Sequence, residues 1–388
     1  MFADTHRHAA RLGAACIALV VAACGDPVEV RHRQQLEASA VQLGPDGRIG
    51  VQVSPGRPSV ERDDGALAVR VLASAPWPTV RFSNGTVEPQ QLEATLTNVD
   101  IDADWSATVA AIVAGARRDP QCTQERFTER GEVVVAPPAL DVLDATTLRV
   151  SVGLEACTSL SLQSALSADA PTLRLAVIGP ADGDLGWLGR ALNAAVRAEP
   201  DVIVSLGGVR SPRGGYSAAS DRFAATGAPR VVVFGRDDRR AAGTFRATFG
   251  QTDFAWAAGR LNGLVLDTAD ARLAADQLEL LRQVSPTGGG WFTTDTFSMG
   301  GDATDGLRSA PQAARVVEAL RRAELTQAFS SASARGQTRT FAGITLHTML
   351  GGRRGQDDQL WLLDVVDPWG EARIELEQLP FAAGLSAP

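Results

Sequence analysis

Three short apolar runs in the second half of the chain each end in glycine, and they limit the possible folds more than any other feature. Residues 173–178 lead into Gly179, residues 202–206 into Gly207, and residues 231–234 into Gly235. The first two runs are followed by segments whose apolar residues recur at helical spacing. Strands that alternate with helices predict a layered α/β sheet, which presents loops at the carboxyl ends of its strands. Similar runs predict further strands at 261–266, 341–345 and 360–366, and helical spacing recurs at 187–196, 273–281 and 316–320.

The first half of the chain has a period of two instead. Apolar and polar residues alternate over 148–154, and turn signals such as Ser83-Asn84-Gly85 separate several runs of this kind. Short alternating strands with regular turns predict an immunoglobulin-like β-sandwich. One stretch, 107–116, is predicted to form a helix that crosses between strands. The predicted organisation is a signal peptide (1–23), a tether (24–45), a β-sandwich (46–168) and an α/β domain (172–382).

Composition supports two domains and excludes one class of partner. The chain has 388 residues, of which 45% are hydrophobic, enough for two cores. The formal net charge is -8, and the sequence contains no block of like charge. Since binding to nucleic acid needs a basic patch, we expect no nucleic-acid partner.

The N-terminus predicts export and attachment to a membrane. Arg7 and Arg11 form a weakly basic region before an apolar segment, 12–23, that is too short to span a bilayer. This segment ends in Val21-Ala22-Ala23-Cys24, which resembles a bacterial lipobox, and the resemblance implies that lipid is attached to Cys24. The alternative is an ordinary secretory signal with an incidental cysteine. Glycine rather than aspartate follows Cys24, which by resemblance implies the outer membrane of the bacterial envelope.

Two cysteines remain in the mature chain, Cys122 and Cys157. In an exported protein a lone pair of cysteines predicts a disulfide. The alternative is a pair of free thiols with a catalytic role. No histidine lies between the two positions to activate a thiolate, which favours the disulfide.

The second half also carries an ordered series of motifs. Residues 201–209 are a strand that runs into Gly207-Gly208, and residues 228–238 are a strand that runs into Gly235-Arg236-Asp237-Asp238. Residues 261–281 combine a strand, Leu-Asp-Thr and a Gln-Leu helix. In order and spacing the series resembles the calcineurin-like metallophosphoesterases, over 172–379. The resemblance implies their layered α/β fold, and a preceding β-sandwich is the arrangement of purple acid phosphatases.

The same positions lack the residues that such an enzyme needs. The resemblance implies two metal ions that bind phosphate and convert a bridging water to hydroxide. Gly208 stands where the family has a bridging aspartate, and Arg236 and Asp237 replace an asparagine and a histidine. At the first motif, Pro180 replaces an aspartate and Asp182 replaces a histidine.

Little remains at the other metal positions. Asp238 matches a family position, but residues 331–334 lack the family's two histidines. Of the four histidines, only His347 lies in the predicted α/β domain, just after a predicted strand and at most near the rim of the site. Borderline metals are held largely by imidazole, so no dinuclear transition-metal site is expected. Residues 288–306, rich in glycine, threonine and aspartate, are predicted to form a loop over the strand ends. Within this stretch, the resemblance implies a strand over 290–296.

Two sets of side chains leave alternatives open. Several aspartates could hold a hard cation such as Ca²⁺ or Mg²⁺ through oxygen, or could serve as helix caps and solvated loop residues; they are Asp182, Asp184, Asp237, Asp238 and Asp267. Arg236 could neutralise carboxylates and offer a fork to an anionic ligand, or could be a surface arginine.

The sequence therefore predicts an exported, lipid-anchored protein with a catalytically dead metallophosphoesterase-like domain. Its expected role is a binding or scaffolding module at the cell envelope, with an unknown protein or glycan ligand and no cofactor. The alternative is a phosphoric ester hydrolase with a reduced, carboxylate-only site for a divalent metal ion. A third possibility is a purely structural lipoprotein.

Overall fold

The structure is a computed structural model, and it describes residues 39–43, 47–63, 66–111, 133–212, 215–284, 289–295, 297, 307, 309–331, 336–352 and 359–381.

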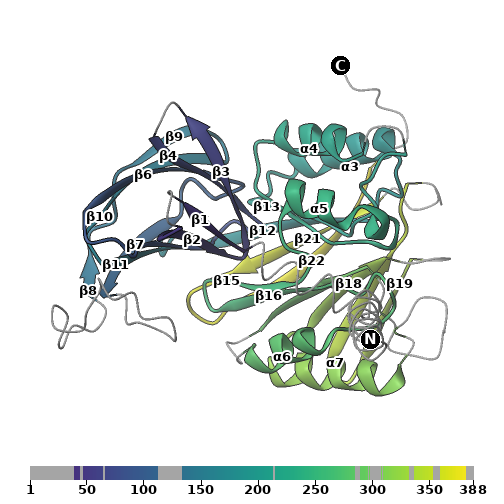
Figure 1. The fold of residues 1–388 in the computed structure, drawn as a ribbon. Helices are drawn as coiled ribbons and strands as arrows, with labels where there is room; N and C mark the ends of the chain where they lie inside the picture. Colours follow the sequence, from purple (N-terminus) through teal and green to yellow (C-terminus); the bar gives the residue numbers. More distant parts are fainter. Residues whose placement is uncertain are drawn as a thin grey trace, which may run out of the picture.

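The first part of the chain forms two facing β-sheets (Figure 1). One sheet has the strand order β1 (Ala40–Leu43), β2 (Ile49–Ser54), β5 (Thr79–Asn84), β11 (Thr158–Ala165), β7 (Asp104–Ala111) and β8 (Val133–Val135). The other has the order β3 (Gly56–Asp63), β4 (Ala66–Ala73), β6 (Gln90–Thr97), β10 (Thr147–Leu154) and β9 (Leu140–Asp144). All of these strand pairs are antiparallel except β4 with β6, which is parallel.

The alternating pattern of the sequence becomes the inward face of this sandwich. Along β10, Leu148, Val150, Val152 and Leu154 are buried, and the residues between them are exposed. They share one apolar core with residues of the opposite sheet such as Phe82. Because successive side chains of a strand point to opposite faces, a period of two buries one face and leaves the other in water.

Two predictions for this part of the chain are wrong. The predicted helix over 107–116 begins as β7, where Val109 pairs with Leu160 of β11, and its remainder lies outside the described residues. The small and β-branched residues of this stretch fit the spacing of a helix as well as that of a strand. Pairing with β11 makes it a strand. The predicted tether contains β1, whose Val41 pairs with Val51, so the sandwich begins before residue 46.

The second part of the chain contains two mixed sheets with helices on their outer sides (Figure 1). The first sheet has the order β14 (Arg230–Val232), β13 (Val202–Ser205), β12 (Thr172–Ile178), β21 (Gln359–Val366) and β22 (Arg373–Pro380). The second has the order β15 (Phe254–Ala258), β16 (Leu261–Leu266), β17 (Gly290–Thr294), β18 (Gln327–Ser331), β20 (Ile344–Met349) and β19 (Gln337–Phe341).

Helices cover each of these sheets. The first sheet is covered by α3 (Leu185–Arg197), α4 (Ser217–Ala224), α5 (Ala242–Phe249) and the 3₁₀ helix η2 (Arg236–Ala241). The second is covered by α6 (Ala275–Gln283) and α7 (Ala310–Arg322). The predicted layered α/β architecture is observed. No helix within the described ranges is both long enough and apolar enough to cross a membrane.

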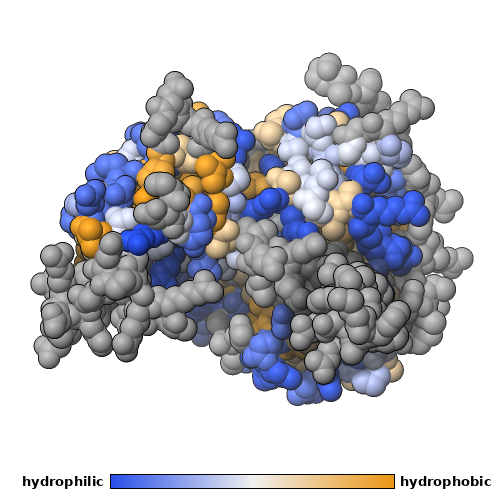
Figure 2. Space-filling view, viewed as in Figure 1, coloured by the Kyte–Doolittle hydropathy of each residue, from blue (hydrophilic) through white to orange (hydrophobic). Residues whose placement is uncertain are grey.

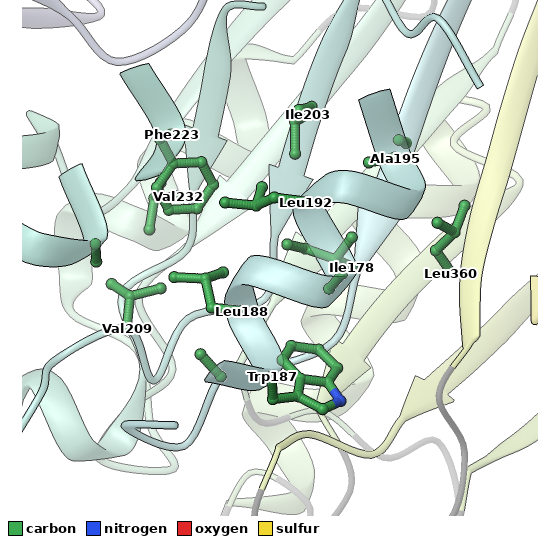
Figure 3. Close-up of a cluster of buried hydrophobic side chains, with 14 of the residues drawn as sticks. Ile178, Trp187, Leu188, Leu192, Ala195, Ile203, Val209, Phe223, Val232 and Leu360 are labelled. Carbon is green, nitrogen blue, oxygen red and sulfur yellow. The ribbon is translucent and has the colours of Figure 1, made fainter. Parts of the chain in front are cut away.

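Helix α3 illustrates how the sequence specifies this packing. Its buried residues recur at helical spacing, and Leu188 and Leu192 lie against Ile178 and Ile203 of the sheet (Figure 3). The side chain of Asp184 caps the helix by accepting a hydrogen bond from Trp187 N at 2.9 Å. The first glycine-ended strand is therefore followed by the helix that the sequence predicts.

The predicted strand at 341–345 is wrong in its boundaries. The chain instead forms a hairpin of β19 and β20, with Ala342 and Gly343 in its turn at φ values of +53° and +81°. Two consecutive positive φ values are typical of a tight hairpin turn. The alanine at the first of these positions hides the turn from a search for glycine pairs.

The sandwich and the α/β part meet in a contact with both apolar and polar components. Trp77 stacks on Trp256 with ring centroids 5.5 Å apart. Asn98 Nδ2 donates to Arg230 O at 2.8 Å, and Arg230 N donates to Asn98 Oδ1 at 2.7 Å. Gln251 N also donates to Ser74 Oγ at 2.7 Å. We call the reciprocal pair of bonds between Asn98 and Arg230 the clasp.

Candidate functional site

The loops that follow β12 and β13 lie in direct backbone contact. Ala181 N donates to Gly207 O at 2.9 Å, and Gly183 N donates to Gly208 O at 2.7 Å. Gly208 has a φ of +64°, and a β-carbon added there would lie 2.8 Å from Asp182 N. Glycine is therefore required at 208 by both conformation and space. Backbone atoms occupy the space beside Asp182 into which an aspartate at this position would have to extend.

Asp238 is the central side chain of these strand ends. It is fully buried, and its Oδ2 accepts hydrogen bonds from Gly235 N at 3.0 Å and Gly208 N at 3.2 Å. Its Oδ1 accepts a hydrogen bond from the hydroxyl of Tyr216 at 3.1 Å. Tyr216 is the only tyrosine of the chain and is itself buried. One carboxyl group thus joins the loop after β13, the loop after β14 and the start of α4.

Burial controls the proton affinity of this carboxyl group. Desolvation raises the pKa of Asp238 to about 7, although hydrogen bonds from Gly235, Tyr216 and Gly208 act in the opposite direction. The nearby Asp295 carboxyl also raises the pKa of Asp238. Burial and the proximity of Asp238 raise the pKa of Tyr216 as well, so the phenol keeps its proton and acts as the donor.

Asp295 is a second buried carboxylate of this region, which we call the strand-end cluster: Asp238, Asp295, Tyr216, Gly208 and Gly235. Asp295 Oδ2 accepts from Arg236 N at 3.0 Å, and Oδ1 accepts from Ser331 Oγ at 2.9 Å. A β-carbon added to Gly235 would lie 3.3 Å from Asp238 Oδ2 and 3.5 Å from Asp295 Oδ1, so both carboxyl groups lie beside the same glycine.

The sequence predicted a loop over 288–306, while the resemblance implied a strand over 290–296, and neither gave Asp295 a role. The structure shows that 290–294 form β17, a strand that is buried along its whole length, with Asp295 directly after it. The available signal was the position itself, since the carboxyl end of a buried parallel strand is where an α/β sheet presents functional side chains. The part of 288–306 that continues this loop lies largely outside the described residues.

The other predicted aspartates are dispersed. Asp182 is half-buried beside Gly208, and Asp184 is the cap of α3. Asp237 is exposed, next to the buried Asp238. Asp267 is buried and accepts from Ala269 N at 3.1 Å, within its own turn.

Arg236 contributes its backbone to the strand-end cluster. Its amide donates to Asp295, and its carbonyl oxygen accepts from Arg239 Nε at 2.9 Å. The residue as a whole is exposed. The structure therefore gives Arg236 a structural contact through its main chain, and the predicted anion contact of its side chain stays a prediction.

His347 is not beyond a strand or at a rim, as the sequence predicted, but lies within β20. It is buried, with Nδ1 3.1 Å from Thr338 Oγ1 and Nε2 3.1 Å from Gln327 Oε1. Its ring stacks on Phe329 with centroids 5.0 Å apart. Burial lowers the pKa of His347 to about 4, so the ring is neutral at physiological pH. Its ring centroid also lies 4.4 Å from that of Trp361 in β21, so His347 is a core residue between the two sheets.

The residues present do not fit the two-metal centre that the resemblance implies. Within the described part of the chain, no three His, Cys, Asp or Glu side chains are grouped so that they could hold a metal ion. Asp238 already accepts hydrogen bonds on both of its oxygens. An aspartate at Gly208 would meet the backbone of Asp182.

Of the three cysteines with predicted roles, the structure describes one. Cys157 is 3% exposed at the turn before β11. Cys24 and Cys122 lie outside the described residues. The lipid attachment and the disulfide therefore stay predictions.

Comparison with known proteins returns structures but no sequence families. No family model matches the chain, and no curated protein matches it. A dimetal phosphatase from Danio rerio is 11% identical with a TM-score of 0.42, covering 55% of this chain and 100% of that one. A putative 5′-nucleotidase from Staphylococcus aureus is 10% identical with a TM-score of 0.40, covering 55% of each chain.

A third similar structure is GAP50, described as the anchor in the inner membrane complex of Plasmodium. It is 13% identical with a TM-score of 0.38, covering 55% of this chain and 90% of that one. These similar structures cover about half of this chain, and at identities of 10–13% with TM-scores of 0.38–0.42 the similarity assigns neither a family nor an activity.

Proposed function

We propose that this protein is a non-catalytic binding or scaffolding module whose α/β part has the layered fold of a metallophosphoesterase without its metal centre. The observation that carries the proposal is the hydrogen bonding of Asp238. Gly208, Gly235 and Tyr216 supply three donors to a single buried carboxyl group. The group that matches a family position therefore holds the loops together.

These three hydrogen bonds disfavour a role for Asp238 as a metal ligand. A carboxylate binds a cation through the same lone pairs that accept hydrogen bonds. A metal ion bound by both oxygens of Asp238 would have to displace at least one of the two backbone donors on Oδ2, and each buried donor left without a partner costs about 1–3 kcal/mol. The raised pKa of Asp238 acts in the same direction, because a proton competes with a cation for the carboxylate.

The proposal includes a location at the bacterial envelope. The lipobox-like segment before Cys24 supports a lipid anchor, and the glycine after it supports the outer membrane. Incorporation of radiolabelled palmitate in the bacterial host tests the anchor, and Cys24→Ala is expected to abolish this incorporation.

Cys122 and Cys157 are proposed to form a disulfide, which a count of free thiols in denaturant tests. For the sandwich, the two facing sheets support an immunoglobulin-like assignment, although the parallel pair β4–β6 departs from an all-antiparallel arrangement.

The proposed loss of catalysis is tested by metal content and turnover together. The full chain, purified in detergent and exposed to Mn²⁺, Zn²⁺ and Fe²⁺, is expected to retain well below one metal ion per chain by plasma mass spectrometry. Hydrolysis of bis-p-nitrophenyl phosphate is expected to equal that of the buffer. A stoichiometric metal ion together with turnover that a chelator removes would sink the proposal.

A second candidate function rests on the two carboxylates beside Gly235. Asp238 and Asp295 approach the same glycine, and a pair of carboxylates can hold a hard cation such as Ca²⁺ or Mg²⁺ through oxygen. Such a site would support the alternative of a reduced, carboxylate-only phosphoesterase. Thermal unfolding with and without Ca²⁺ or Mg²⁺ distinguishes the two functions. If the cation site exists, Asp295→Asn removes the stabilisation and Asp237→Asn, at an exposed neighbour, leaves it unchanged.

A further inference from the structure

A polar groove lies where the sandwich meets the α/β part. It has a volume of about 810 Å³, within the usual range for small-molecule sites. One wall comes from β3, β4 and the turn between β9 and β10, and the other from α4 and the end of α5. Figure 2 shows the surface hollowed between these two parts. The strand-end cluster does not line this groove.

Arg230, the first residue of β14, lines the groove. Its guanidinium carbon lies 5.9 Å from the ring centroid of Phe223 and 5.7 Å from that of Phe249. Its backbone amide and carbonyl are engaged by the clasp with Asn98. Among the described residues, the guanidinium has no hydrogen bond and no ion pair, so its planar set of donors is unused.

The environment of this guanidinium is poor in water. Burial is the cause that lowers the pKa of Arg230 to about 10, so the group stays charged at neutral pH. The faces of the two aromatic rings attract the cation and offset part of the cost of its desolvation. A partly desolvated arginine fork without an acidic partner is suited to bind carboxylate or phosphate in bidentate geometry.

The remaining lining favours an anion with hydroxyl groups. Arg57 and Arg70 add positive charge on the opposite wall. Of the two acids that line the groove, Asp144 accepts from Thr146 N at 2.8 Å within its own turn, and Asp221 is exposed. Neither forms an ion pair with Arg230. The other polar lining consists largely of hydroxyl side chains: Ser59, Thr97, Thr146, Thr147, Ser217 and Ser220.

We propose that this groove binds a small organic anion, a polyol that carries a phosphate or a carboxylate, with the charged group on the guanidinium of Arg230 and the hydroxyl groups along the walls. The site is separate from the strand-end cluster, so it stands whether or not a metal binds there. The proposed ligand site of the module is thus the junction between the sandwich and the α/β part.

Isothermal titration of the full chain with three probes of one skeleton tests the proposal. Glucose 6-phosphate and glucuronate carry the two candidate charged groups, and glucose carries neither. We expect one or both anions to bind and glucose not to bind. The anion that binds more tightly identifies which charged group the groove selects.

Variants assign the binding to Arg230. Arg230→Met keeps the length of the side chain and its contact with the rings, and is expected to weaken anion binding roughly 10- to 100-fold. Arg230→Lys keeps the charge but loses the fork, and is expected to weaken it by a smaller factor. Arg197→Met, at an exposed arginine in the last turn of α3, is the matched control and is expected to leave the affinity unchanged.

Three results would overturn the proposal. The first is the absence of binding of both anions at concentrations of about 10 mM, where even a weak site with a dissociation constant near 1 mM is filled. The second is binding of glucose as tight as that of the anions. The third is unchanged anion affinity in Arg230→Lys, which keeps the result decisive should Arg230→Met fail to fold.

Discussion

The strand-end cluster and the groove at the junction differ in what satisfies their central ionisable side chain, which is the buried Asp238 in the first and the partly buried Arg230 in the second. At the strand ends, Asp238 receives three hydrogen bonds from its own chain and holds two loops and a helix together. In the groove, the guanidinium of Arg230 contacts two aromatic rings, and no described carboxylate pairs with it. The position that matches the enzyme family is internally satisfied, and a position outside the family motifs is not.

This difference between Asp238 and Arg230 distinguishes polar groups that stabilise the fold from polar groups that can bind a ligand. A buried polar group whose partners all come from the same chain stabilises the fold and has nothing left to offer a ligand. A partly buried group with donors unused by its own chain can still bind a partner from solution. This criterion favours the junction over the strand ends as the place where a ligand would bind.

Removal of Asp238 is expected to have the largest effect. Asp238→Ala leaves Gly208 N, Gly235 N and the Tyr216 hydroxyl without an acceptor, and should lower the free energy of unfolding by about 3–5 kcal/mol. Asp237→Ala, at an exposed neighbour, should change it by less than about 0.5 kcal/mol. Urea unfolding followed by tryptophan fluorescence measures both. Equal stability of the two variants would contradict the structural role of Asp238.

The proton affinity of Asp238 predicts the next largest effect. Its pKa is about 7 in the folded chain and lower in the unfolded chain, so the folded state retains a proton that the unfolded state releases. The contribution of this group is fully present below about pH 4 and is lost as the pH rises through 7, on the order of 2–4 kcal/mol.

Asp238→Asn isolates this contribution, because the amide does not titrate in that range. The difference in unfolding free energy between the parent chain and Asp238→Asn should therefore depend on pH between 4 and 7. A difference that is constant over this range would show that the carboxyl group is ionised throughout.

Restoring the family residue at 208 should destabilise the chain without restoring a metal site. Gly208→Asp places a side chain at a φ of +64° and 2.8 Å from Asp182 N, and should cost about 1–3 kcal/mol. Gly215→Asp is the matched control, since Gly215 has a φ of +61° and nothing within 4 Å of an added β-carbon. The difference between the two variants measures the steric contact together with the cost of burying a new carboxyl group beside Asp182. Tight metal binding by Gly208→Asp would show that the cluster can still open.

The smallest effect on stability is expected at the junction. Arg230→Met removes two cation–π contacts and also the cost of a buried charge, so unfolding free energy should change by about 1 kcal/mol or less. The same variant should lose anion binding. Thermal unfolding with and without glucose 6-phosphate tests both statements. If Arg230→Met lowers the free energy of unfolding by several kcal/mol in the absence of anion, Arg230 stabilises the fold as Asp238 does.

Local patterns in the sequence were sufficient to predict the elements with the strongest periodicity. The alternation over 148–154 predicted β10, and the runs at 173–178 and 261–266 predicted β12 and β16. Helix α3 was predicted because its apolar residues, from Trp187 onward, form one face. Each of these patterns indicates which face of the strand or helix is buried.

The contacts of the candidate sites could not be predicted, because they join residues far apart in the chain. Tyr216 and Asp238 form a bond across 22 positions, and Arg236 and Asp295 across 59. No local pattern records that Gly235 lies against both carboxylates. Arg230 begins a short edge strand and reads as a surface arginine, because its burial depends on α4, α5 and a domain more than a hundred residues earlier.

Two errors have a similar origin. His347 was placed after a strand because the turn at Ala342 and Gly343 was not recognised, and the whole hairpin was displaced. Residues 107–111 were assigned to a helix because alanine and valine at this spacing suit either structure, and the pairing partner β11 lies some fifty residues later.

The clasp between Asn98 and Arg230 also governs how the groove can move. Its two hydrogen bonds join the backbone of β14 to a residue of the sandwich that is itself bonded to Ala73 O at 2.8 Å. A hinge between the two parts would have to break this pair of bonds and the stack of Trp77 on Trp256. The two walls of the groove are therefore expected to keep their separation when a ligand binds. Binding should then follow a single kinetic step, with no closure of one part of the chain onto the other.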